Sequence, residues 1–158
     1  MGKPKDAALS QCALNEMFEY RDGVLYWKPK PAGTVDGNGY MQTGIKGKYF
    51  KNHRIIFLMH HGYLPDLIDH IDGNKRNNRI ENLREASNSQ NNYNKRLQKN
   101  NRSGVKGVHW VERFKKWRVR IGVDGKDLHV GYFEKYEDAV FAATKARMDN
   151  HRLFARSK

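Results

Sequence analysis

The sequence predicts an α+β protein whose C-terminal third is a small three-stranded antiparallel sheet packed on one helix. Basic and apolar residues alternate strictly from Lys116 to Ile121, which is the period of a strand with one exposed face. The dipeptide Asp124-Gly125 follows, and it is typical of a two-residue hairpin turn. Alanines recur at helical spacing between residues 136 and 148, so a helix can approach the sheet closely. Residues 104–110 and 128–133 are expected to complete the sheet.

The composition indicates a partner with negative charge. The 158 residues carry a net charge of +13 and only 38% are hydrophobic, so the cores should be small and nucleic acid is the favoured partner. The segment from residue 91 to residue 120 contains ten basic residues and one acid, Glu112, so it carries +9 of the total charge. No apolar run is long enough for a membrane span, and Cys12 is the single cysteine, which excludes an intrachain disulfide.

The N-terminal segment is expected to begin with a helix and continue as a strand. Apolar residues fall at three- and four-residue spacings from Asp6 to Tyr20, which predicts a helix with one apolar face. Residues 21–23 should then turn the chain. Val24 to Trp27 is expected to be a strand, because residue types that favour strands end there at a Lys-Pro-Lys-Pro run.

A hairpin and a helix are expected next. Residues 40–45 and 48–50 should pair around Lys46-Gly47, with basic and aromatic residues alternating along them. Such a hairpin either lies in a DNA groove or is simply a half-buried hairpin, and the residues favour neither. Residues 53–61 should form a short helix that leads, through Leu64-Pro65, into a further strand.

The stretch from Ile68 to Asn91 carries side chains suited to phosphodiester chemistry. Asp69 offers the hard anionic oxygen that Mg²⁺ prefers, and His70 can move a proton near neutral pH. Asn82 and Asn91 lie 13 and 22 residues beyond Asp69, so they join this pair if the polar loop folds back. An ion and a base together suit the attack of water on a phosphodiester. The alternative is an ordinary loop, since turns also require Asp, Asn and Gly.

This stretch resembles the HNH endonuclease motif in the form found in small homing-type nucleases of phages. The resemblance rests on His53-Arg54, on residues 69–74, on Asn77-Asn78 and on residues 81–84. It implies a ββα-metal fold for the motif, placed behind the N-terminal β-hairpin region. Arg54 is expected to contact DNA, and His53 to be structural or to contact phosphate.

The resemblance also implies roles for four side chains. His70 would be the general base, and Asn82 would orient the loop and the histidine. Asp69 and Asn91 would hold one divalent ion per active site. Because Asn91 supplies an amide oxygen, Mg²⁺ or Mn²⁺ is expected rather than Zn²⁺.

The C-terminal module resembles the DNA-binding domain of plant ethylene-response factors, which also occurs fused to phage HNH nucleases. The matching pieces are residues 107–108, 117–121, 131–133 and 137–139. In that family the sheet lies in the major groove of DNA. Trp117 is expected to pack in the core of the module and not to contact DNA. His129-Val130 replaces a usual Trp-Leu pair, so the base specificity of the plant domains is not carried over. The expected DNA contacts of the module and the segment before it are Lys95, Arg96, His109, Trp110, Arg113, Lys115, Arg118 and Arg120.

We therefore expect an N-terminal β region with an HNH nuclease domain (1–94), a basic linker (95–103) and a DNA-binding domain (104–158). The linker can be a plain spacer, can track phosphates, or can do both. The expected function is a metal-dependent, site-specific endonuclease of phage homing type, acting on double-stranded DNA in the cytoplasm of an infected bacterium. It should bind DNA as a monomer or weak dimer, and no association with a membrane is expected. The rivals are a DNA-binding regulator with an inactive HNH core, an RNA-binding protein and a structural DNA coat.

Overall fold

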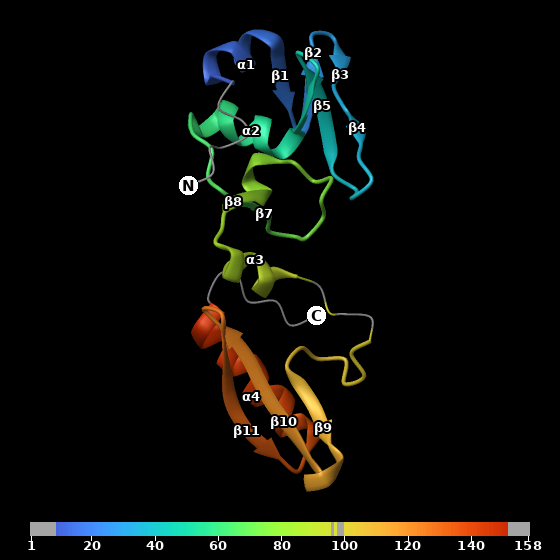
Figure 1. The fold of residues 1–158 in the computed structure, drawn as a ribbon, viewed down its shortest axis with the longest axis vertical. Coiled ribbons are helices and arrows are strands. Elements are labelled where there is room, and N and C mark those ends of the chain that lie inside the picture. The colour runs from blue at the N-terminus through green and yellow to red at the C-terminus, as the bar shows by residue number, and fades with distance from the viewer. Residues whose placement is uncertain (1–8, 96, 98–99, 152–158) are drawn as a thin grey trace. The chain divides into compact units, whose positions relative to one another are not determined.

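The computed structural model describes residues 9–95, 97 and 100–151, and the chain divides into two compact units, residues 1–86 and 87–158. Small antiparallel sheets and α-helices occur in both units, which confirms the α+β class (Figure 1). Within the described residues, no helix has both the length and the apolar character needed to cross a membrane. The domain limits expected from the sequence, with a linker at 95–103, stay a prediction.

The first unit begins with a helix that is shorter than expected. Helix α1 covers Gln11–Met17 and is capped by Ser10, whose Oγ accepts a hydrogen bond from the Ala13 amide at 3.2 Å. The prediction of a helix up to Tyr20 was wrong, because β1 (Phe18–Arg21) pairs with β2 (Val24–Trp27). The turn between them has positive φ at Asp22 and Gly23, as a two-residue hairpin requires. The expected helix start at residues 6–8 lies outside the described residues.

The expected hairpin and helix that follow are confirmed. Strand β3 (Lys30–Pro31) pairs with β2, and a second sheet has the order β4 (Thr34–Val35), β5 (Met41–Ile45), β6 (Lys48–Lys51). Lys46 and Gly47 form the turn with positive φ. Helix α2 (Asn52–His61) ends at Gly62 in the left-handed conformation, its amide bonded to the Leu58 carbonyl.

Helix α2 supplies the centre of the first core. Its buried residues Ile55, Ile56 and Leu58 pack with Leu14 of α1 and with the strands β1 and β2. Strands β7 (Ile68–His70) and β8 (Leu83–Glu85) form a two-stranded sheet that adds Ile68 and Leu83 to this core. The 3₁₀ turn η1 (Ile80–Asn82) leads into β8. The loop between β7 and β8 thus begins and ends on residues anchored in the core.

The second unit contains helix α3 and a three-stranded sheet on α4. Helix α3 (Asn88–Asn94) starts where Ser87 caps it, as predicted, with a reciprocal bond between Ser87 and Gln90. The sheet has the order β11 (Lys126–Phe133), β10 (Lys116–Val123), β9 (Val108–Val111), with η2 (Glu112–Phe114) between β9 and β10. Helix α4 covers Tyr136–His151.

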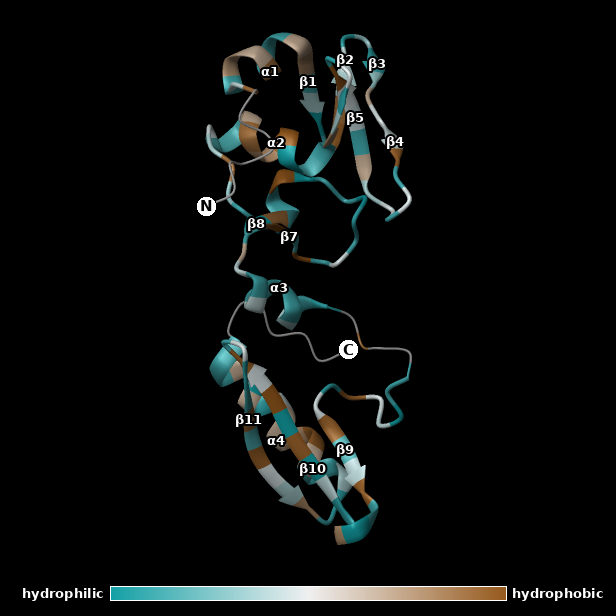
Figure 2. Ribbon diagram, in the orientation of Figure 1, coloured by the Kyte–Doolittle hydropathy of each residue, from teal (hydrophilic) through white to brown (hydrophobic). Residues whose placement is uncertain are grey.

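The second core confirms the alternation read from the sequence. Val108, Val119, Ala139 and Ala143 are fully buried between the sheet and α4. Figure 2 shows the hydrophilic and hydrophobic residues that alternate along β10. The first strand is shorter than expected, because Gly107 and Gly104 take positive φ and turn the chain before β9 begins.

Candidate functional site

Strands β7 and β8 place Asp69 beside Arg84. The two strands pair antiparallel, with Asp69 opposite Arg84 and His70 opposite Leu83. Arg84 donates two hydrogen bonds to Oδ2 of Asp69, from Nε at 2.9 Å and from Nη2 at 2.8 Å. The side chains of Asp69 and Arg84 are only 6% and 16% exposed. The expected metal ligand is therefore part of a shielded, charge-assisted ion pair, for which the sequence analysis had given Arg84 no role.

His70 ends β7 as a buried imidazole whose orientation is fixed. Its Nε2 lies 2.9 Å from Oδ1 of the buried Asn78. Because an amide oxygen can only accept, Nε2 donates this bond, so in the neutral form of the ring the lone pair that a general base needs is on Nδ1. The ring of His53 packs edge-on against His70 with centroids 5.0 Å apart, and the ring of Tyr40 lies at 6.0 Å. These contacts hold the imidazole in one orientation.

His53 is a neutral packing partner of His70. It lies in the first turn of α2 and is 8% exposed. Burial, and then the neighbouring charge of His70, lower the pKa of His53 from 6.5 to about 3, so the ring carries no charge at neutral pH. Its Nδ1 has no hydrogen-bond partner among the described residues.

A network of amide and carboxylate groups fixes the loop that follows His70. Asn82 accepts a hydrogen bond from the amide of Asp72 at 3.0 Å and donates to Oδ1 of Asp72 at 3.0 Å and to the carbonyl of Asn77 at 2.7 Å. Burial acts to raise the pKa of Asp72, but the hydrogen bonds from Asn77, Asn74 and Asn82 outweigh it and lower that pKa. Asn82 therefore closes the loop, while its part in catalysis stays a prediction.

The two residues expected to hold the ion lie in different units. Asp69 is in β7 of the first unit, and Asn91 is in the second turn of α3 in the second unit. Their donor atoms, a carboxylate oxygen and an amide oxygen, fit a hard cation such as Mg²⁺ or Mn²⁺. Within the described part of the chain, no cluster of three His, Cys, Asp or Glu side chains is arranged to hold a metal.

Basic side chains flank this site on the first unit. Nη1 of Arg54 lies 3.3 and 3.4 Å from the carbonyls of Pro65 and Asp66, so it braces the segment that leads into β7. Lys75, which was not among the expected site residues, donates to the carbonyl of Asn38 at 3.0 Å and lies 4.8 Å above the ring of Tyr40. The motif loop is thus tied to the turn before β5.

Several of the expected DNA contacts lie on one face of the sheet formed by β9, β10 and β11. This is the face away from α4, called the open face below. Arg118 lies opposite His109 on β9 and Tyr132 on β11, and Arg120 lies opposite His129. These five side chains occupy the face away from α4, because Val108 and Val119, their strand neighbours, are buried against the helix. Burial, and then the charges of Arg118 and Arg120, lower the pKa of His109 and favour its neutral form. His129 and Tyr132 were not among the DNA contacts expected from the sequence.

Trp110 does not share that face. It lies directly opposite Trp117, and the two rings meet edge to face with centroids 5.3 Å apart. Trp117 in turn contacts Tyr136 of α4 and packs against the core, as predicted for it. Trp110 is nevertheless 44% exposed, and its Nε1 donates to Oε2 of Glu112 at 2.6 Å.

The remaining expected contacts lie at the ends of the sheet or before it. Arg113 and Lys115 are exposed around η2, where the ring of Phe114 meets Tyr132 of the open face. Lys95 is exposed directly after α3. Arg96 lies outside the described residues. For all these side chains, binding of DNA stays a prediction.

Residues 50–93 match the HNH endonuclease family. The matched range runs from the end of β6 to α3 and contains the ion pair, His70 and the amide network. Protein 3.8 of Escherichia phage T7 is 36% identical over 89 residues, which cover 56% of this chain and 73% of that protein. No solved structure shows significant similarity. The HNH and phage resemblances are thus confirmed, whereas the resemblance of the C-terminal module to plant ethylene-response factors stays a prediction.

Proposed function

The chain carries an HNH endonuclease domain and belongs to the family of the phage T7 relative, and from this premise we propose that it is a metal-dependent DNA endonuclease. The finer proposal is a site-specific phage homing enzyme that hydrolyses phosphodiesters in double-stranded DNA. The observation that supports nuclease activity is the buried His70, whose Nε2 donates to Asn78 inside the matched range.

His70 would take a proton from the attacking water at Nδ1. Asn78 supports this role, since its Oδ1 accepts from Nε2 and would stabilise the imidazolium that forms. Asn82 supports it indirectly, because it holds the loop that carries Asn78. A bound Mg²⁺ or Mn²⁺, held by Asp69 and Asn91, would stabilise the charge that develops on the phosphate and on the leaving 3′ oxygen.

The second unit would select the DNA site. Arg118 and Arg120 on the open face of the sheet, with His109 opposite Arg118, form a basic surface of the kind that contacts phosphates and base edges. Arg54, Arg113, Lys115 and the basic residues from Lys95 onward would add phosphate contacts. Contacts spread along the chain suit a long target in which one mismatch costs about 1–3 kcal/mol.

A DNA-binding regulator with an inactive HNH core is the second candidate. The observation in its favour is the ion pair of Asp69, because Arg84 places a positive charge where the metal is expected. This candidate keeps the basic sheet of the second unit and loses only the chemistry.

The test is cleavage of a supercoiled plasmid that carries the DNA flanking the gene. Wild-type protein should nick or linearise the plasmid with Mg²⁺ or Mn²⁺ and leave it intact with EDTA. His70→Ala should lower the cleavage rate by about 100-fold or more, since general bases contribute about 10²–10⁴-fold, and should keep DNA affinity within about two-fold. His60→Ala is the matched control, because His60 is exposed at the end of α2 and lies outside the site.

Two results would contradict the proposal. Tight DNA binding without cleavage in either metal would leave the regulator as the function. Full activity of His70→Ala would show that another group activates the water.

A further inference from the structure

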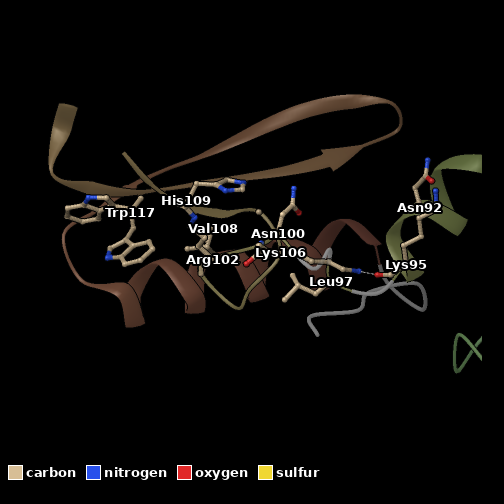
Figure 3. A pocket seen from close by; sticks show the side chains of 13 residues that line it. Asn92, Lys95, Leu97, Asn100, Arg102, Lys106, Val108, His109 and Trp117 are labelled. Carbon is tan, nitrogen blue, oxygen red and sulfur yellow. Dashed lines mark hydrogen bonds between the residues drawn. The ribbon is translucent and has the colours of Figure 1, made fainter. Parts of the chain in front are cut away.

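A groove in the second unit combines positive charge with aromatic rings. It has a volume of about 920 Å³ and runs, in Figure 3, from Trp117 past Arg102 and Lys106 to Lys95 and Asn92. Among the described residues that line it, none is acidic. The groove is thus complementary to a negatively charged chain.

The positive charge of the groove is held in place by the fold. Lys106 donates from Nζ to the carbonyls of Tyr93, at 3.2 Å, and Lys95. The carbonyl of Lys106 accepts from Nη1 of Arg147, which is only 3% exposed. Arg147 does not itself line the groove and has no carboxylate partner among the described residues, so its buried positive charge adds to the charge of the second unit close to Lys106.

Trp110 presents a ring whose orientation is fixed before any ligand arrives. It is 44% exposed on the edge strand β9, its Nε1 is tied to Glu112 and its ring leans on Trp117. Because it lies on the opposite side of the sheet from Arg118, contact between the open face and a duplex leaves it without a role.

We propose that this groove binds a single-stranded segment of DNA, with phosphates along Lys95, Arg102 and Lys106 and one base stacked on Trp110. A positively charged groove with exposed aromatic rings is the general design of single-strand sites, since every base has a flat face. A duplex keeps its bases stacked on each other and cannot use the indole. The site is separate from the residues proposed for cleavage, and among its described lining residues it shares only His109 with the open face of the sheet.

The experiment measures binding of a fluorescent oligo(dT) of about 12 nucleotides to the full chain in EDTA, by anisotropy. Trp110→Ala should weaken binding by about 5- to 150-fold, the range found for loss of one stacked base, while Trp110→Phe keeps most of the affinity. Arg102→Gln should weaken binding and reduce the slope of log affinity against log salt by about 0.7. Phe141→Ala and Lys145→Gln, exposed on α4 and away from the groove, are the matched controls and should change nothing.

A second pair of variants separates the two surfaces. Arg118→Ala with Arg120→Ala should weaken binding of a duplex and leave oligo(dT) binding within about two-fold. Loss of oligo(dT) binding in that variant, with Trp110→Ala unaffected, would overturn the proposal. Tighter binding of oligo(rU) than of oligo(dT) would also overturn it, because RNA would then be the occupant. Since EDTA prevents cleavage, these results do not depend on whether the chain is a nuclease.

Discussion

The ion pair between Asp69 and Arg84 allows a sharp test of how the first unit is held together. Arg84→Met removes the guanidinium and keeps much of the side-chain length, so Asp69 loses two hydrogen bonds and a counter-charge. Breaking a buried pair costs about 3–5 kcal/mol, and the 16% exposure of Arg84 places the expected loss at the lower end, about 3 kcal/mol.

Arg21→Met is the matched control. Arg21 donates to Glu19 from Nε at 2.8 Å and from Nη2 at 2.7 Å, nearly the same distances, but these side chains are 60% and 41% exposed. Because solvent screens an exposed pair, Arg21→Met should change the free energy of unfolding little, so the two variants differ chiefly in burial.

The assay is urea denaturation of both variants, followed by circular dichroism and checked by thermal melting. For a unit the size of residues 1–86, each kcal/mol shifts the melting temperature by about 4–8 °C, so Arg84→Met should lower it by about 12–24 °C. If Asp69 binds the ion, Mg²⁺ at 100 times its dissociation constant for Arg84→Met should stabilise that variant by about 2.7 kcal/mol, and it should stabilise wild type by less. Equal losses of free energy in Arg84→Met and Arg21→Met would refute the argument from burial.

Two further substitutions test the loop and the second sheet by the same denaturation assay. Asn82→Ala removes three side-chain hydrogen bonds and should cost about 2–3 kcal/mol, whereas Asn38→Ala, in a turn that bonds through its backbone, should cost less than about 0.5 kcal/mol. Gly107→Ala would bring a Cβ within 2.2 Å of the Arg120 carbonyl oxygen at φ +73° and should cost more than about 3 kcal/mol. Gly125→Ala has similar φ and open space around it, so it should cost only about 1–2 kcal/mol, and an equal loss at both glycines would contradict the steric argument.

Local signals predicted much of the fold because the residues that create them are neighbours in sequence. Asp124-Gly125 and Lys46-Gly47 form two-residue turns with positive φ, and Ser87 caps α3 where the sequence places it. The prediction that the N-terminal helix extends to Tyr20 was wrong for a related reason. The apolar spacing around Phe18 suits a helix and a strand, and the hairpin turn at Asp22-Gly23 decides for the strand.

The partners of the candidate site could not be predicted, because they depend on register and on contacts across the fold. The motif names Arg84 and Asn78, but only the pairing of β7 with β8 puts Arg84 opposite Asp69, and only the folded loop brings Asn78 to His70. Similarly, the resemblance names Trp110, and the register of β9 on β10 decides on which face it lies. Residue identity follows from sequence, whereas the face a residue occupies follows from pairing.

This separation of faces gives the second unit two basic surfaces that need not compete. Arg118 points to the side away from α4, and Trp110 lies on the side of Trp117, which packs against the helix. The groove shares only His109 with the open face, so replacement of Arg118 and Arg120 should leave the affinity of the groove nearly unchanged. If both surfaces bind as proposed, the second unit can hold a duplex and a single strand at the same time.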